Sequence, residues 1–395
     1  MKQIFYFLLI ILLFFSCKIK EENKFYFADG TEIKDENLKS TLEKELLKVY
    51  KNKIELGPLK IYTTLNPKLN HNIHRIVSEF GKSYRDSLIK ENPKYTFEID
   101  SLFNSKRLFS SELFILENKS GKIASISLSN GSAFRIHEND FYAYKPFGYL
   151  LTIEKGVKLD DIYEAREVRS NEVMFHITVK GSYYCFNSGR ITKPFQSYPK
   201  SDWENLAKRM ELNLNLDGFS NQGFQYIQTN TFDLLKFFAT IQNNGVYVNP
   251  SVIKLVKNKD NQVIYRSKIH KVQAINSEHN IKMKELLKSS SLSWSYKSYY
   301  TTHGIKENAF IYSGGSNDAR RFVIYSNENY TIAWNLFEYI HYQKFNIKIS
   351  DQLFYPPYIK DILKELECNH KEESFFHEIQ KIEKEEELKT IQSGL

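Results

Sequence analysis

Apolar positions along the chain recur with two different periods, which predict separate helices and strands. A spacing of three or four residues, typical of one helical face, occurs over residues 38–50, from Pro67 onward, and over 231–242. A shorter helix is expected over 149–156, where the apolar run ends at a glycine. Asn66 precedes Pro67 and has the residue type of a helix N-cap. The pattern therefore predicts helices distributed along the whole body of the chain.

The strand-like segments follow one another with turn residues between them. Residues 112–116 and 122–128 flank a turn that contains Asn118 and Gly121, which predicts a hairpin. Hairpins interspersed with helices favour an α+β fold with an antiparallel sheet over a parallel βαβ arrangement. Further strands are expected at 59–65, 246–248, 252–256, 262–265, 310–312, 321–325 and 331–337.

The first 16 residues have the pattern of an export signal. Lys2 precedes an apolar run over 4–15, which is too short to span a bilayer but suits a signal peptide. Ser16 and Cys17 follow, and the next residues are polar, an arrangement that resembles a bacterial lipoprotein signal. We therefore expect a signal peptide over 1–16, lipidation of Cys17, and a body that faces the periplasm or the cell surface. An ordinary signal, or an uncleaved anchor with an incidental cysteine, is the alternative.

The rest of the chain divides by composition into three parts. Residues 17–58 are expected to form a lipidated tether and a short helix, 59–345 the main domain, and 346–395 a charged helical tail. Beyond Cys17, the chain contains only Cys185 and Cys368, which are too few for a disulfide framework or a zinc site. The histidines are scattered, and neither a metal nor a cofactor is expected.

Composition and charge exclude some classes of function. The chain has 395 residues, 42% of them apolar, which is enough to bury a core. The formal charge of +8 arises from 55 basic and 47 acidic residues spread along the chain. A nucleic-acid surface needs clustered Lys and Arg, and no such stripe occurs in the sequence, so no nucleic-acid partner is expected. The charge supports at most a mild attraction to an anionic membrane or wall polymer.

Five segments together resemble, in the same order, the transpeptidase domain of penicillin-binding proteins, especially of the bifunctional class. The resemblance extends over about residues 59–340 and implies an antiparallel sheet flanked by helices, with a helical subdomain. It also implies a serine acyltransferase site built from S-x-x-K, S-x-N and K-T-G motifs. The segments are 61–69, 115–126, 145–156, 231–265 and 313–337.

The resemblance places tyrosines at two catalytic positions. Lys145 matches the lysine of S-x-x-K, but Tyr142 stands where the serine belongs. Tyr312, Ser313 and Gly314 stand at K-T-G, so the cation that would hold a substrate carboxylate is absent. We expect the two rings to narrow the cleft and make it more apolar. Exchanging them for Ser and Lys is expected to cost little stability, because a cleft lining leaves a solvated space.

The other motif positions are also altered. The middle motif is expected at 198–200, which contains neither Ser nor Asn. Ser132 lies in a G-S-A-F-R run that resembles a family sequence with lysine in the last place. However, Arg135 stays protonated and cannot act as a base. Ser132 also precedes Tyr142 by ten residues, so it is a weak alternative nucleophile.

The sequence thus predicts a non-catalytic envelope lipoprotein with a degenerate transpeptidase-like domain. Such a protein would bind peptidoglycan peptide, a wall synthase or another envelope protein, and would be held to a membrane through Cys17. Two alternatives stay open. One is an active transpeptidase or β-lactam-acylated enzyme that uses a non-standard serine such as Ser132. The other is a purely structural envelope lipoprotein.

Overall fold

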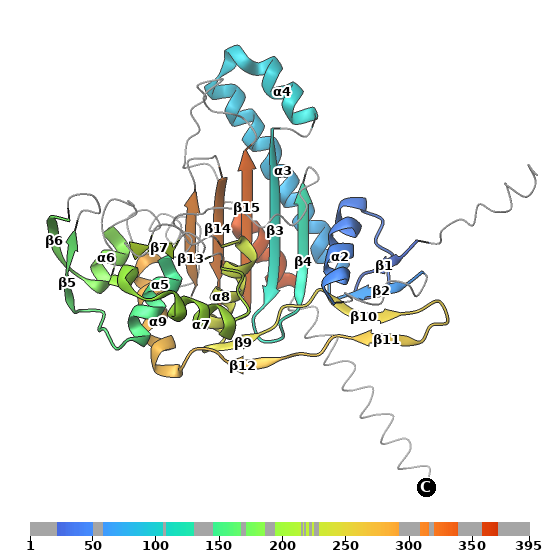
Figure 1. Cartoon of the computed structure of the whole chain (residues 1–395). Helices are drawn as coiled ribbons and strands as arrows, with labels where there is room; N and C mark the ends of the chain where they lie inside the picture. The colour runs from blue at the N-terminus through green and yellow to red at the C-terminus, as the bar shows by residue number, and fades with distance from the viewer. Residues whose placement is uncertain are drawn as a thin grey trace, which may run out of the picture.

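The structure is a computed structural model of the whole chain (Figure 1). It describes residues 22–49, 58–105, 108–129, 145–166, 171–185, 194–214, 216, 219–220, 223–224, 229–291, 309–315, 320–338 and 358–369.

A five-stranded antiparallel sheet forms the centre of the molecule, as the strand pattern predicted. Its order is β13-β14-β15-β3-β4, so the hairpin of β3 and β4 joins three strands from the far end of the chain. The turn of this hairpin includes Gly121, whose φ of 72° suits glycine, and an added Cβ would lie 2.7 Å from the Asn249 carbonyl oxygen. The strands are β3 (Phe109–Glu117), β4 (Ile123–Ser129), β13 (Phe310–Gly315), β14 (Arg320–Ser326) and β15 (Tyr330–Glu338).

One face of this sheet is covered by helices that share a large apolar core with it. Helix α8 lies directly against the sheet, and α5, α6, α7 and α9 lie beside it (Figure 1). The predicted helix over 231–242 is confirmed with those bounds, whereas the helix expected over 149–156 begins earlier, at Lys145. The helices are α5 (Lys145–Glu154), α6 (Val179–Cys185), α7 (Lys200–Arg209), α8 (Thr231–Gln242) and α9 (Ser277–Ser291).

The opposite face of the sheet is covered by α3 (Pro67–Glu91) and by helical residues 358–369. The predicted cap of α3 is confirmed, because the Asn66 side chain accepts a hydrogen bond from the Leu69 amide at 2.9 Å. The far end of α3 and helix α4 (Thr96–Asn104) project beyond the sheet (Figure 1).

Part of the expected charged tail belongs to the folded domain. Ile359, Ile362 and Leu366 are buried in the core beside α3, and the Asn66 side-chain amide donates to Asn369 at 2.8 Å. The spacing of these three apolar residues forms one helical face, which a reading by charge alone overlooks. The charged run beyond residue 369 lies outside the described residues.

A smaller sheet has the order β1-β2-β10-β11 and is covered on one side by α2 (Glu36–Val49). It corrects the expectation of a polar tether before residue 38, because β1 pairs in parallel with β2 and Phe25 is fully buried. A three-residue strand with one buried side chain is too short to stand out in a charged segment. The strands are β1 (Lys24–Tyr26), β2 (Lys60–Thr63), β10 (Ile253–Lys257) and β11 (Val263–Arg266).

The remaining elements are short strand pairs and 3₁₀ turns at the periphery of the two sheets. Across the described ranges, no helix is both long and apolar enough to cross a membrane. These elements are η2 (Pro93–Tyr95), β5 (Ile162–Arg166), β6 (Val173–Thr178), η3 (Pro194–Ser197), β7 (Phe219–Ser220), β8 (Gly223–Phe224), β9 (Val246–Val248) and β12 (Lys271–Gln273).

Candidate functional site

Lys145 is the first residue of α5 and is buried, with 7% of its surface exposed. Its Nζ donates a hydrogen bond to the Tyr183 carbonyl oxygen and lies 4.7 Å from the centre of the Tyr183 ring. Helix α5 is held closely, because a Cβ added at Gly148 would lie 2.5 Å from the ring of Phe195. The motif lysine is therefore directed at α6, near the end of that helix at Cys185.

Hydroxyl groups join α5 and α6 beside this lysine. Ser182 Oγ donates to the Val179 carbonyl at 2.7 Å, so the Tyr149 hydroxyl is the donor in its hydrogen bond with Ser182. Burial raises the pKa of the neighbouring Tyr163. The Ser182 proton is thus directed at a backbone carbonyl, an arrangement that fixes α6 and does not activate the hydroxyl.

Tyr312 lies in β13 and is 8% exposed. Its ring stacks on Phe238 of α8, with centres 5.7 Å apart and planes inclined by 27°. It also contacts Phe322 of β14 at 5.6 Å. The backbones of Ser313 and Gly314 pair with β14, opposite Val323 and Phe322. The position that resembles the K-T-G lysine in sequence therefore holds an aromatic ring that is packed between the sheet and α8.

This ring belongs to a continuous series of aromatic contacts that joins α5 to β13 through α8. Phe147 of α5 contacts Phe237 at 4.6 Å between ring centres, and Phe237 contacts Phe238 at 5.6 Å. Phe238 then stacks on Tyr312. We call Phe147, Phe237, Phe238, Tyr312 and Phe322 the aromatic row. The segments that carry Lys145 and Tyr312 are thus linked through α8 by apolar rings.

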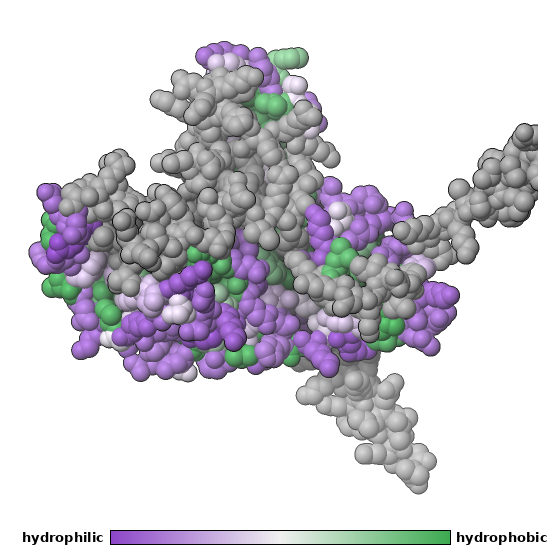
Figure 2. Space-filling view, in the orientation of Figure 1, coloured by the Kyte–Doolittle hydropathy of each residue, from purple (hydrophilic) through white to green (hydrophobic). Residues whose placement is uncertain are grey.

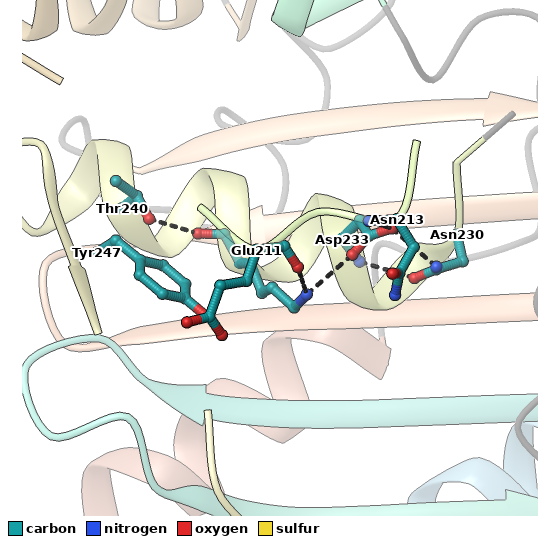
Figure 3. Close-up of polar contacts among 7 residues, drawn as sticks. Glu211, Asn213, Asn230, Asp233, Thr240 and Tyr247 are labelled. Atoms are coloured by element: carbon teal, nitrogen blue, oxygen red, sulfur yellow. Dashed lines mark hydrogen bonds and ion pairs between the residues drawn. The ribbon is translucent and has the colours of Figure 1, made fainter. Parts of the chain in front are cut away.

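The N-terminal end of α8 is packed quite differently, around a buried ion pair (Figure 3). The fully buried Asp233 carboxylate accepts from Lys236 Nζ at 3.0 Å. The second oxygen of this carboxylate accepts from the Asn213 backbone amide at 3.0 Å and from the Asn230 side-chain amide at 2.8 Å. Asn230 in turn caps α8 by accepting from the Asp233 amide at 2.8 Å.

Lys236 also contacts the loop that follows α7. Lys236 Nζ donates to the carbonyl oxygen of Glu211, a residue with a left-handed φ of 49°. The Tyr247 hydroxyl donates to the Glu211 carboxylate at 3.0 Å. Burial and the nearby Glu211 and Asp233 charges raise the pKa of Tyr247. We call Glu211, Asn213, Asn230, Asp233, Lys236 and Tyr247 the polar cluster. These residues bond to one another, so the cluster stabilises the fold at the start of α8.

The structure describes some of the predicted site residues and not others. Lys145, Tyr312 and the backbones of Ser313 and Gly314 are described, whereas Tyr142, Ser132 and Cys17 lie outside the described residues. These motif assignments stay predictions. Residues 198–200, the expected middle motif, precede and begin α7, while Lys145 contacts α6. Helix α6 could not be predicted from the sequence, because it has only seven residues. Its contact with Lys145 is through a backbone carbonyl, which any residue type supplies.

The described residues contain no group of three or more His, Cys, Asp or Glu side chains that could hold a metal ion. Cys368 is an exposed free thiol. Around Lys145 and Tyr312, the described side chains are one buried amine, several hydroxyls and a row of aromatic rings.

Neither the known protein families nor the curated proteins include one whose sequence matches this chain. Solved structures do match its fold. One is PonA1 of Mycobacterium tuberculosis in complex with penicillin V, with 14% identity, a TM-score of 0.56, and 83% of this chain and 91% of that chain covered.

Two further solved structures match the fold over most of the chain. Penicillin-binding protein A from M. tuberculosis, solved as an imipenem acyl-enzyme, is 10% identical with a TM-score of 0.52, covering 87% of this chain and 90% of that one. The D,D-transpeptidase domain of a peptidoglycan glycosyltransferase from Eggerthella lenta is 12% identical with a TM-score of 0.51, covering 88% and 98%. The chain therefore has the fold of penicillin-binding transpeptidase domains, in a strongly diverged sequence.

Proposed function

We propose that this protein is a non-catalytic envelope lipoprotein whose transpeptidase-like domain binds peptidoglycan peptide or another envelope protein. One observation carries the proposal: the ring of Tyr312 is buried against Phe238 at the position that resembles the K-T-G lysine. A tyrosine there supplies no positive charge to a substrate carboxylate. A fold without its catalytic groups still offers a binding surface.

The surroundings of Lys145 support the same conclusion. The amine donates to a carbonyl of α6, and the nearby Ser182 hydroxyl donates to Val179. An acylating site of this kind needs a serine hydroxyl whose proton is directed at the amine. The resemblance places Tyr142 where that serine belongs, and a phenol oxygen is displaced from a serine oxygen by the length of the ring.

Labelling with a fluorescent penicillin tests the proposal. The purified full chain should form no covalent adduct, while an active penicillin-binding protein in the same gel is labelled. Ser132→Ala is the matched variant for the alternative nucleophile. Saturable labelling of the unaltered chain would establish an enzyme and overturn the proposal. If Ser132→Ala loses the label, Ser132 is the nucleophile; if Ser132→Ala keeps it, another residue is.

Binding to purified peptidoglycan separates a binding protein from a purely structural one. We expect the full chain to co-sediment with insoluble peptidoglycan, or to be cross-linked in cells to an envelope protein. A chain that sediments alone and forms no cross-link would favour the structural alternative.

The lipid anchor has its own test. Cys17→Ala should abolish metabolic palmitate labelling and move the protein from the membrane to the soluble envelope fraction. The expected loss is large, because each buried CH₂ of an acyl chain contributes about 0.8 kcal/mol of membrane binding. Unchanged labelling in Cys17→Ala would contradict the anchor, and Cys368→Ala is the matched control that should remain labelled.

A further inference from the structure

The outer face of the small sheet collects positive charge. Its four strands contain five basic residues and no acidic one. The inner face is apolar and packs in one core with α2. The basic residues are exposed or half-buried: Lys24, Lys60, Lys254, Lys257 and Arg266. We call them, together with Tyr26 and Tyr62, the basic face.

The strand register arranges these residues in two rows. Lys24, Lys60 and Lys257 are successive partners across β1, β2 and β10. In the next row, Tyr26 and Tyr62 stack with their ring centres 5.0 Å apart. Lys257 Nζ joins the rows by lying 5.4 Å from the centre of the Tyr62 ring. Cations and aromatic rings therefore share one surface.

The positive charge of this face is not neutralised by the described residues. None of its five cations forms an ion pair with another described residue, and Lys60 donates instead to the Asn261 side chain at 2.7 Å. Acids lie at its margin: Glu22, two residues before Lys24, Glu32, beside Tyr26, and Asp260, in the turn after β10. Residues 251–271 contain only that acid against Lys254, Lys257, Lys259, Arg266, Lys268 and Lys271.

Folding creates this surface from three distant segments, around residues 24, 60 and 254–266. The sequence alone does not reveal this face, because Lys24 and Lys60 lie far along the chain from the basic residues of 254–271 until the strands pair. Figure 1 shows the small sheet at the opposite end of the molecule from α6 and β5, and this end is largely hydrophilic in Figure 2.

We propose that the basic face docks on anionic phospholipid headgroups of the membrane that anchors the chain. The inference rests on the envelope location in the proposed function. Only six residues lie between Cys17 and Lys24, and the seven steps from one to the other span at most about 25 Å when extended. A lipid on Cys17 therefore keeps β1 close to the bilayer. Cations there are attracted by anionic lipid, and tyrosines suit the boundary between water and lipid.

Vesicle sedimentation with an unlipidated chain tests the proposal. The chain from residue 17 with Cys17→Ser retains every described residue and lacks the anchor. It should bind vesicles of mixed phosphatidylcholine and phosphatidylglycerol at low salt, and release them at high salt. Vesicles of phosphatidylcholine alone should not bind it. No binding to the anionic vesicles would overturn the proposal while leaving the lack of catalysis and the lipidation of Cys17 untouched.

Charge reversal locates the binding surface. Lys60→Glu with Lys257→Glu should weaken vesicle binding by about 30-fold or more, since each cation at an anionic surface contributes about a factor of five. Lys200→Glu with Lys288→Glu, on α7 and α9, makes the same change of net charge elsewhere and should retain binding. Equal loss in both pairs would overturn the assignment to this face, and so would binding to soluble polyphosphate without binding to vesicles.

Discussion

The two ends of α8 are buried with opposite chemistry. At its start, the polar cluster supplies a hydrogen-bonding partner to each oxygen of the buried Asp233 carboxylate. In its second half, Phe237 and Phe238 belong to the aromatic row that includes Tyr312. This core therefore keeps a buried charge where every oxygen of the carboxylate has a hydrogen-bonding partner. Where the resemblance leads one to expect a catalytic cation, it holds a ring.

The largest expected effect follows from breaking the polar cluster. Asp233→Ala leaves the Lys236 ammonium buried without its carboxylate, and should lower the free energy of unfolding by about 3–5 kcal/mol. Urea denaturation monitored by circular dichroism measures the loss.

A matched double change separates charge from packing. Asp233→Leu with Lys236→Met removes both charges together and should recover part of the stability lost in Asp233→Ala. A double variant no more stable than Asp233→Ala would show that the amide and capping contacts, rather than the ion pair, stabilise this end of α8.

Placing a cation in the aromatic row tests the apolar second half of α8. Tyr312→Lys puts an ammonium against Phe238 and Phe322, and should cost about 2–3 kcal/mol of unfolding free energy. The cost arises from burial, because Tyr312 is only 8% exposed and water has little access to an ammonium at this position. Thermal denaturation measures the change.

Tyr312→Met is the control for that substitution, because it keeps an apolar side chain of comparable length. It should cost less than Tyr312→Lys, at about 1–2 kcal/mol. A Tyr312→Lys protein as stable as the unaltered chain would show that the region accepts a cation, and would remove the contrast between the two ends of α8.

The smallest effect concerns Tyr247, which closes the polar cluster. Tyr247→Phe loses a hydrogen bond to Glu211 and should cost about 1 kcal/mol at neutral pH. The folded state holds the phenol proton more tightly than the unfolded state, so this stabilisation is complete below the unfolded pKa of about 10 and is lost as the pH rises further. The free energy of unfolding of the unaltered chain should therefore fall more steeply above pH ~10 than that of Tyr247→Phe. Parallel slopes would contradict the assigned pKa shift.

Most of the fold could be predicted from the sequence, because helical periodicity, helix caps and hairpin turns each depend on residues that are close together in the chain. The helix over 231–242 and the cap at Asn66 follow from periodicity and a single side-chain bond. The antiparallel class followed from the hairpin of β3 and β4. The strand β1 was missed, and the helix at 358–369 was expected as part of a charged tail without its place in the core. The few buried side chains of both segments lie among charged residues, and only distant partners make them part of the core.

The candidate site was less accessible to prediction. The family resemblance indicated Lys145 and Tyr312 as candidate positions, but not which residues surround them. The contact of Lys145 with a Tyr183 carbonyl and the stacking of Tyr312 on Phe238 depend on tertiary packing, for which the local sequence has no signature. The basic face is the clearest case, because its rows exist only after β1, β2 and β10 have paired.

The docking of residues 358–369 on α3 has a consequence for how the chain reaches its folded state. Tyr358 places its ring 5.3 Å from that of Phe80, and Glu365 accepts a hydrogen bond from Asn72 at 2.7 Å. A chain that emerges from its N-terminus forms α3 early, but the core around that helix closes only when nearly all of the chain has appeared. Contacts of such long range make folding slow and leave apolar surface open to aggregation and proteolysis meanwhile. A nascent chain of this protein therefore keeps the apolar face of α3 uncovered until residues 358–369 have emerged.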